Sequence, residues 1–596
     1  MSKKKVTGLP HQEDAHTKSY DPQVMRRLWE FMHPYRWQYL LGVFYTLLQA
    51  VAVSAGPYLI GVALDAGIAA EDVVALRNAV LAYVFITIVQ WLMIYLRVNL
   101  MAHVGQSIIY NMRSQLFHHL QNLSLSFYSR YSVGRVITRV INDVSVLRQF
   151  MTWAVVASAR DLFVLCGIIL AMLKMNLRLS LIAFTVLPFM VVATMVFRKF
   201  ARANYRKVRA AVSWVNSVLA ENVNAVRVVQ AFSRQTYNFR FFREEVNQHN
   251  LDLNLKAARL SSAFYPSVDF LGAVATALVV WFGGQAVQDE QVTAGVLVAF
   301  ILYIGRFFGP IRSLSQRFDQ MQSAMAGGER VFALLDTPSE VQDAPDAFEM
   351  PHIRGDVEFR DVEFQYTDDN TPVLHRINLK VKAGETIALV GPTGAGKSTM
   401  VKLLCRFHDP TGGQVLVDGI DLRRVTQHSL RSQMGIVSQD PFLFDGTVVE
   451  NIRFGCPDCS EAAVVEAAKA VGAHDFIVRM RNGYHTAVGE GGVALSVGQR
   501  QLISFARALL ASPRILILDE ATSSVDTQTE IIIQKALMRL LQGRTAFVIA
   551  HRLSTVVNAD KIVVLERGRI VEQGNHEELL DRGGTYARLY QMGFED

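Results

Sequence analysis

The sequence predicts two fused parts: a polytopic α-helical membrane domain with six transmembrane helices, then an α/β nucleotide-binding domain with a phosphate-binding loop. Three observations predict this. Six long apolar segments lie within the first 320 residues. In the second half of the chain, a G-x-x-x-x-G-K-S motif lies between a predicted strand and a predicted helix. Only 19% of the 596 residues are charged. Soluble proteins carry about 25% charged residues, so the composition favours a membrane protein over a wholly soluble one.

Changes in composition divide the chain into four parts. Residues 1–21 form a polar tail, 22–320 the membrane domain, 321–351 a linker and 352–596 the nucleotide-binding domain. Residues 22–36 have apolar side chains at helical spacing beside Arg26 and Arg27, so we expect an amphipathic helix on the membrane surface.

Each apolar segment supplies about the 20 residues that a membrane-spanning helix needs. The six segments cover residues 38–63, 75–100, 153–173, 176–197, 264–286 and 292–315. The third is interrupted by Arg160 and Asp161, and is therefore the weakest. Six such segments in so short a stretch argue against buried helices of a soluble core.

The distribution of charge predicts the orientation in the membrane. Residues 198–262 carry twelve Lys or Arg against four acids, whereas two short loops carry acids such as Asp65 and Asp289. The positive-inside rule places both termini and both long connections in the cytoplasm. Those connections continue the spanning helices, with tips near Phe127–Arg135 and Glu221–Arg234. The net charge of +7 therefore reflects topology, and we expect no nucleic-acid partner.

A phosphate-binding loop follows the apolar run Thr386–Val390 and precedes a helix over Thr399–Phe407. Its residues are Gly391, Pro392, Thr393, Gly394, Ala395, Gly396, Lys397, Ser398 and Thr399. The glycines turn backbone N–H groups onto phosphate oxygens, and the helix N-terminus adds positive charge. In this motif the lysine reaches the β- and γ-phosphates and the serine hydroxyl ligates Mg²⁺.

A second strand, Ile515–Leu518, ends in two carboxylates, Asp519 and Glu520. Beside a phosphate loop, Asp519 can hold Mg²⁺ through water, and Glu520 can orient or deprotonate the attacking water. Upstream, a helix that runs to Leu510 opens with Leu495, Ser496, Val497, Gly498 and Gln499. Taken alone, these five residues indicate only a capped helix.

Together, the order and spacing of these motifs resemble the ATP-binding cassette (ABC) exporters, half-transporters of the multidrug and lipid export type, over about residues 22–590. The resemblance implies ATP and Mg²⁺ as ligands. It implies that Tyr366 stacks on adenine, Gln439 touches Mg²⁺ and the water, Asp526 faces the dimer partner and His551 contacts the γ-phosphate. Glu520, His551 and Gln439 are then the catalytic residues, and Ser398, Gln439 and Asp519 hold the metal.

The resemblance also implies a dimer. In this family each ATP lies between the phosphate loop of one chain and the signature of the other, here Leu495–Gln499, and the two cytoplasmic tips act as coupling helices. Val497 stands where the family usually has glycine, and could crowd the γ-phosphate. The partner is a second half-transporter, either a copy of this chain or a relative.

The implied function is ATP-driven export of hydrophobic or amphipathic, drug- or lipid-like small molecules by alternating access, from a bacterial plasma membrane. Membrane lipid is a further partner. A dedicated lipid flippase, or an exporter of a specific peptide or metal conjugate, shares every motif. A soluble cassette ATPase that acts on DNA or translation is opposed by the six apolar segments.

Two further groups of residues attract attention. Arg160, Asp161, Asp269 and Arg306 lie in or near spanning segments, where charge is a functional hypothesis by default. Cys456 and Cys459 form C-x-x-C, but no second pair follows, so we expect a cytoplasmic surface loop and neither a zinc nor a redox site.

Overall fold

Long apolar helices build the first part of the chain in the computed structural model, which describes residues 21–366, 371–519, 527–550 and 553–591. The chain forms two compact units. One contains Val133–Thr337 and the described residues before Asn122; the other contains Asn122–Ser132 and the described residues from Pro338 onward.

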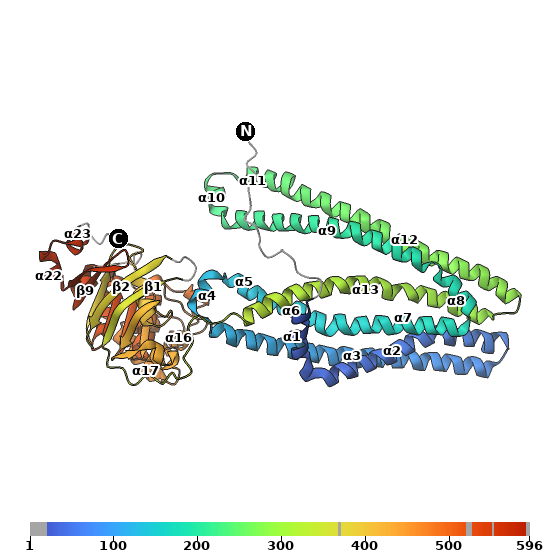
Figure 1. The fold of residues 1–596 in the computed structure, drawn as a ribbon, viewed down its shortest axis with the longest axis horizontal. Helices are drawn as coiled ribbons and strands as arrows, with labels where there is room; N and C mark the ends of the chain where they lie inside the picture. Colours follow the sequence, from blue (N-terminus) through green and yellow to red (C-terminus); the bar gives the residue numbers. More distant parts are fainter. Residues whose placement is uncertain (1–20, 367–370, 520–526, 551–552, 592–596) are drawn as a thin grey trace. The chain divides into compact units, whose positions relative to one another are not determined.

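The first unit is entirely helical among its described residues (Figure 1). Its α-helices are α1 (Pro22–Met32), α2 (Arg36–Val62), α3 (Val73–Gln121), α5 (Val133–Thr138), α6 (Val144–Arg148), α7 (Val155–Met175), α8 (Leu177–Phe184), α9 (Leu187–Asn224), α10 (Val226–Ala231), α11 (Gln235–Phe241), α12 (Gln248–Gln288) and α13 (Ala294–Leu335). Short 3₁₀ and π segments join some of them: η1 (His33–Tyr35), η2 (Ala63–Ala69), η3 (Arg139–Asp143), η4 (Gln149–Ala154) and η5 (Phe242–Asn247).

Five helical runs among the described residues are long and apolar enough to cross a membrane. They are Pro22–Ala69, Val73–Gln121, Val133–Met175, Leu177–Asn224 and Gln235–Gln288. Each contains one predicted span. The sixth prediction, residues 292–315, falls at the start of α13, where the apolar helix Ala294–Pro310 is shorter. The helical membrane domain is confirmed, whereas the count of six is not exactly reproduced.

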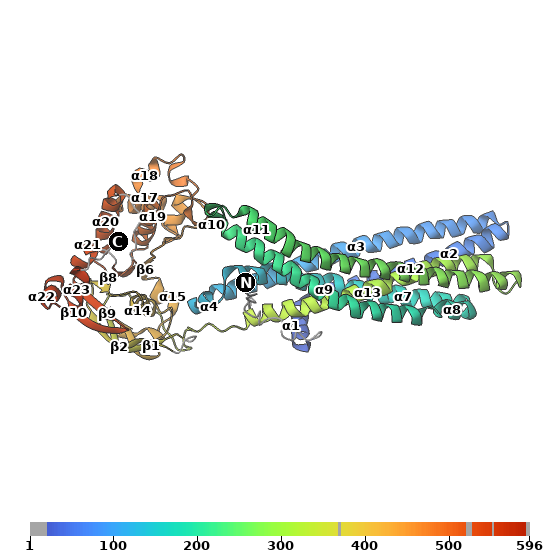
Figure 2. The ribbon, with the colours of Figure 1, turned by 90° about the horizontal axis from the view of Figure 1, so that it is seen from above.

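The extensions of these helices beyond a membrane thickness are confirmed. At about 1.5 Å per residue, α3, α9 and α12 are each longer than the roughly 30 Å of a hydrocarbon core. Helices α9 and α12 run side by side (Figures 1 and 2). Helix α13 continues to Leu335, so residues 321–335 of the predicted linker are helical.

Helix α1 is formed as predicted, and part of its apolar face packs on protein. Val24, Leu28 and Met32, spaced four residues apart, are buried. The ring of Phe31 stacks on Phe332 of α13, with 6.2 Å between centroids. These contacts show that α13 is an apolar partner of α1, and the place of α1 on a membrane surface stays a prediction.

The second unit mixes strands and helices. Its strands are β1 (Val357–Gln365), β2 (Pro372–Val381), β3 (Thr386–Val390), β4 (Gly412–Val417), β5 (Ile420–Asp421), β6 (Met434–Val437), β7 (Ile515–Asp519), β8 (Thr545–Ile549), β9 (Lys561–Glu566) and β10 (Arg569–Gly574). Its α-helices are α4 (Leu125–Arg130), α14 (Lys397–Leu404), α15 (Gln427–Arg431), α16 (Val448–Arg453), α17 (Glu461–Ala470), α18 (His474–Val478), α19 (Val497–Leu510), α20 (Thr527–Leu541), α21 (Leu553–Val557), α22 (His576–Asp581) and α23 (Thr585–Gln591).

A six-stranded sheet, ordered β10-β9-β3-β8-β7-β6, forms the centre of this unit. Its strands are parallel except β10, and β2-β1-β4-β5 form a second, antiparallel sheet. Alternate residues of β7 enter different cores: Leu516 and Leu518 pack with α16, α17 and α19, whereas Ile515 and Ile517 pack with β1, β2 and α14. Burial on both faces explains the continuous apolar run. Figure 2 shows α17, α18 and α19 away from β1 and β2.

Helix α4 belongs to the second unit although its sequence lies between membrane helices. Its Phe127 is buried and stacks on Tyr131, with 4.6 Å between ring centroids. Arg130 forms an ion pair with Glu340, which lies just after α13. The tip near Phe127–Arg135 therefore begins within the unit that carries the phosphate loop.

The two cysteines of the C-x-x-C sequence form a disulfide, Cys456–Cys459, in the loop between α16 and α17. The pair lies in a surface loop, as expected, because Pro457 and Asp458 are exposed. The C-x-x-C spacing did not predict this bond. A backbone turn brings both sulfur atoms together, and the spacing alone does not reveal such a turn.

Candidate nucleotide site

The phosphate loop is a tight turn that only glycine can make at two places. Gly391 has φ +146°, and a Cβ there would lie 2.1 Å from the Leu565 carbonyl oxygen. Gly396 has φ +102° and precedes α14, and a Cβ there would lie 2.6 Å from the Leu374 side chain. Side chains at these positions would be strained and would clash. The loop therefore ends with its backbone directed along the start of α14, a geometry that binds phosphate.

Lys397, the first residue of α14, is buried to 9% exposure. Its Nζ donates to the carbonyl oxygens of Gly391, at 2.5 Å, and Pro392, at 3.1 Å. Burial lowers the pKa of Lys397, and the charge of Asp519 opposes that shift. The ammonium group thus lies over the loop within the electrostatic reach of a carboxylate.

The order of the strands brings Asp519 to the loop. Leu389 of β3 is level with Ile549 of β8, and Ile549 is level with Asp519 of β7. Since parallel strands end at one edge of the sheet, the phosphate loop, Asp519 and the chain after β8 meet there. Crevices at the carboxyl ends of parallel strands are where α/β proteins bind ligands. The half-buried Asp519 is a suitable oxygen ligand for Mg²⁺.

Tyr366 lies just after β1 and is half-buried beside the helix that follows the loop. Its hydroxyl and that of Thr399 are 3.2 Å apart. Its ring contacts Phe364 and His408 edge-on, with centroid distances of 4.9 and 5.4 Å. This packing holds the ring in place. The sequence pattern does not predict the contact with Thr399, because the two residues are 33 positions apart.

We predict that Tyr366 binds adenine by stacking. Tyr366→Phe keeps the ring and loses only a hydroxyl whose contact, with Thr399, is within the protein, so it should bind ATP with nearly wild-type affinity. Tyr366→Ala should weaken binding by about 1–3 kcal/mol, the range for base–aromatic stacking. Nucleotide titration of the purified variants measures both. Equal losses would assign the role to the hydroxyl instead.

The signature residues open α19 with a complete capping box. Ser496 Oγ accepts from the Gln499 backbone N–H at 3.2 Å, and Gln499 Oε1 accepts from the Ser496 N–H at 3.0 Å. Gly498 is buried, whereas Val497, at the first helical position, is 37% exposed. The Val497 side chain therefore lies on the surface of the helix start, where another chain can meet it.

The other predicted site residues either are exposed near this sheet edge or lie outside the described residues. Gln439 is exposed, two positions beyond β6. Ser398 is exposed on the first turn of α14. Glu520, Asp526 and His551 lie outside the described residues.

No group of three or more His, Cys, Asp or Glu that could hold a metal ion occurs among the described residues. The predicted Mg²⁺ ligands are instead Ser398, Gln439 and Asp519, one hydroxyl, one amide and one carboxylate. This oxygen donor set fits a metal that keeps waters and binds substrate phosphates.

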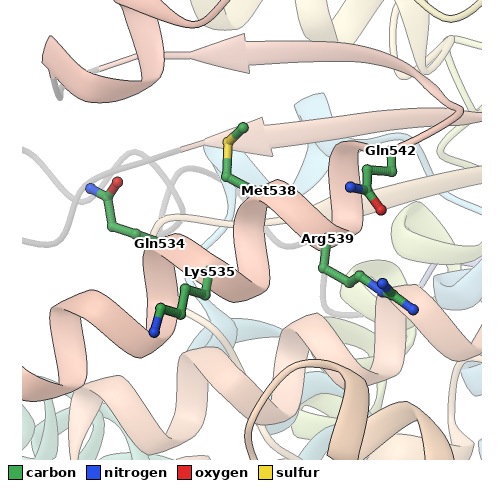
Figure 3. Close-up of a pocket in the computed structure, with 5 residues that line it drawn as sticks. All are labelled: Gln534, Lys535, Met538, Arg539 and Gln542. Carbon is green, nitrogen blue, oxygen red and sulfur yellow. The ribbon is translucent and has the colours of Figure 1, made fainter.

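A surface hollow elsewhere is lined by Gln534, Lys535, Met538, Arg539 and Gln542. Figure 3 shows that these side chains come from α20 and the residue after it, with Met538 and Lys535 on different sides of the helix. The hollow contains none of the motif residues, and we assign it no role.

The charges near the membrane spans have protein partners. Asp161 is 2% exposed and accepts hydrogen bonds from its neighbour Arg160 and from Ser313 of α13. Arg306 Nη1 donates to the Val53 carbonyl oxygen at 2.7 Å, and Asp269 also takes part in an interaction. The contact with Ser313 joins α7 to α13, so Asp161 has a structural role that explains a charge in the third span.

Two families match this chain. One is described as the ABC transporter transmembrane region and matches residues 39–311; the other is described as ABC transporter and matches residues 374–523.

The curated relatives that match it over nearly its whole length include two with named functions. An "ATP-dependent lipid A-core flippase" of Syntrophus aciditrophicus is 38% identical, over 96% of this chain and 95% of the relative. A "Putative multidrug export ATP-binding/permease protein" of Bacillus subtilis is 38% identical, over 96% of this chain and 99% of the relative. The solved structure of a bacterial Atm1-family ABC exporter with ATP bound matches with a TM-score of 0.76 and 30% identity, over 96% of this chain and 99% of that one.

Proposed function

We propose that this chain, which belongs to the ABC transporter family, exports amphipathic compounds with the energy of ATP hydrolysed at its nucleotide site. It is an integral membrane protein whose C-terminal domain hydrolyses ATP and drives export. The proposal rests on the sheet edge at which the phosphate loop and Asp519 lie together. The other unit of the same chain contains apolar helices long enough to cross a membrane. This combination opposes a soluble cassette ATPase.

At the site, each group has a physical task. Lys397 turns from the loop carbonyls toward the β- and γ-phosphates, and the N-terminus of α14 stabilises their negative charge. Ser398, Gln439 and Asp519 would hold Mg²⁺, which would supply positive charge to the phosphate oxygens. Glu520 orients the attacking water and accepts its proton, and His551 contacts the γ-phosphate. Tyr366 fixes the adenine.

The site is completed by a second chain. Ser496 and the N–H groups at the start of α19 approach the γ-phosphate of ATP bound to the partner, and Asp526 faces the same interface. Binding of two ATP molecules closes the interface and turns the membrane cavity outward, and hydrolysis reopens it. Since this chain carries its own phosphate loop, Asp519 and Glu520, a homodimer would contain two complete sites.

The transported class that we propose is drug- or lipid-like: an apolar body with a polar head. The names of the two relatives cover a lipid flippase and multidrug export. We place the protein in a bacterial plasma membrane with both termini cytoplasmic, on the basis of the twelve Lys or Arg in residues 198–262. A dedicated exporter of one lipid, peptide or metal conjugate is the alternative.

The experiment for this proposal is expression of the chain without related half-transporters. We expect a dimer in detergent, with ATP turnover that rises when amphipathic compounds are added. A stable but inactive monomer would contradict a homodimer and leave a heterodimer with a related half-transporter. Stimulation by a single compound in a broad panel would favour the dedicated exporter.

Val497→Gly is predicted to keep or raise ATP turnover in that dimer. The side chain is exposed at the helix start that meets the other chain's γ-phosphate, and its removal allows the backbone to approach more closely. Turnover per dimer at saturating ATP is the measurement, and Val493→Gly is a matched control because Val493 is an exposed valine shortly before the same helix. A large loss at Val497 alone would show that the valine is a fitted part of the site.

A further inference from the structure

The disulfide Cys456–Cys459 lies in a short turn between two helices of the nucleotide-binding unit. The Cys459 backbone N–H donates to the Cys456 carbonyl oxygen at 3.1 Å, and the Cys456 N–H donates to Arg453 at the end of α16. Ser460 then caps α17 by accepting from the Ala463 N–H. These hydrogen bonds bring the two cysteines near each other, and the disulfide fixes the turn between α16 and α17.

Both cysteines are accessible to reagents. Each is partly exposed, and the residues between them, Pro457 and Asp458, are exposed. Cys459 directly precedes Ser460, the N-cap of α17. By contrast, Cys405 is buried, and burial raises the pKa of its thiol to about 12. Within the described part of this unit, Cys456 and Cys459 are therefore the cysteines that reagents can reach.

The turn is connected to the helix that carries the signature. Arg507 of α19 donates from Nε to the Asn451 carbonyl oxygen at 2.8 Å and from Nη2 to the Asn451 side chain at 3.0 Å. Its guanidinium lies over the ring of Phe454, 5.5 Å from the centroid. Next along the chain, Gly455 is so close to α19 that a Cβ would lie 2.3 Å from the Arg507 carbonyl oxygen. Only Gly455 thus separates the disulfide from residues that hold α19.

We propose that Cys456 and Cys459 form a reversible dithiol–disulfide switch that raises ATP turnover when it is closed by a small-molecule disulfide such as oxidised glutathione. The proposal goes beyond the export function and concerns its regulation. Disulfides in cytosolic proteins are usually transient and act in catalysis or redox sensing, and an ATP-hydrolysing domain works where ATP and glutathione occur together.

Closure is a two-electron thiol–disulfide exchange. One cysteine thiolate attacks a sulfur of the small-molecule disulfide, forms a mixed disulfide and releases one thiolate. The second cysteine thiolate attacks the cysteine sulfur of that mixed disulfide and releases the other thiolate. The pair loses two electrons to the small molecule, and its two protons leave with the two released thiols. A dithiol reductant reverses each step.

Closure acts on α19 through packing. The turn that contains the disulfide joins the end of α16 to the start of α17, and both helices pack on α19. When the disulfide is closed, this turn is fixed. Opening the bond gives that turn more freedom, so the signature at the start of α19 is less well pre-organised. Changes of this kind alter coupling by about 0.5–2 kcal/mol, so we expect turnover to fall by at least about twofold on reduction.

The first test counts free thiols in the purified full-length chain by alkylation under denaturing conditions. The chain has four cysteines, and Cys166 and Cys405 are free. After treatment with oxidised glutathione followed by its removal we expect two alkylated cysteines, and after dithiothreitol four. Cys456→Ser with Cys459→Ser should give two in both conditions. Four alkylated cysteines in the oxidised wild type would overturn the switch.

The second test measures ATP turnover in the same two conditions. Wild type should be at least about twofold faster when oxidised, and Cys456→Ser with Cys459→Ser should not respond to oxidation. Cys166→Ser, which removes an exposed cysteine of α7, is the matched control and should keep the response. A closed pair with unchanged turnover, or a response that persists without the pair, would overturn the regulation. Neither outcome depends on which compound is exported.

Discussion

Glu520→Gln should bind ATP like wild type and lose about 10²–10⁴-fold in turnover, the contribution of general acid–base catalysis. In the sequence Glu520 directly follows Asp519, the last residue of β7, which lies at the sheet edge with the phosphate loop. The amide keeps the size of the side chain but cannot accept a proton from water. Nucleotide titration and steady-state turnover of the purified variant separate binding from chemistry.

The matched control for this variant is Glu530→Gln, a carboxylate in the first turn of α20 after the same strand. Its turnover should stay near that of wild type. Wild-type turnover in Glu520→Gln would remove Glu520 from catalysis. Loss of nucleotide binding in that variant would assign the carboxylate to binding or folding.

Lys397→Ala should weaken ATP binding itself. The variant deletes the one ammonium group that lies over the phosphate loop, where it now donates to Gly391 and Pro392. Hydrogen bonds to charged groups are worth about 1.5–3 kcal/mol, which corresponds to roughly a 10–150-fold rise in Kd. Titration with ATP and with adenosine distinguishes the phosphate contact from contacts to the base, since adenosine affinity should not change.

Lys402→Ala serves as its control, because Lys402 lies on the same helix five residues on. Its Nζ is 6.0 Å from the centre of the Tyr366 ring, so we expect a smaller loss. Unchanged ATP affinity in Lys397→Ala would contradict the assignment of the loop as the phosphate site.

Local patterns predict much of the nucleotide-binding unit. The predicted strand Thr386–Val390 coincides with β3, and the apolar run Ile515–Leu518 lies within β7, which ends at Asp519. The helix after the loop starts at Lys397, two residues before its predicted start. These elements could be predicted because a buried parallel strand is apolar at every position and a glycine-rich turn must follow it.

Contacts between distant residues could not be predicted in this way. Leu28 of α1 is buried within the protein, and helical periodicity cannot identify α13 as a partner of α1. The predicted span 176–197 falls in one membrane-length run, Leu177–Asn224, but the pattern does not predict the break between α8 and α9 at Thr185 and Val186. Closure of Cys456–Cys459 depends on a backbone turn.

The central claim, ATP-driven export of amphipathic compounds, is tested most directly by transport into vesicles. The purified chain is reconstituted with its nucleotide-binding unit outside, and a panel of amphipathic dyes and head-group-labelled lipids is added. The measurement is the fraction of each probe protected from a membrane-impermeant quencher. With ATP and Mg²⁺, wild type should protect at least one probe, and Glu520→Gln and Lys397→Ala should protect none above background. The account would be contradicted if the wild type hydrolysed ATP but protected no probe. It would also be contradicted if Glu520→Gln protected the same fraction of a probe as the wild type.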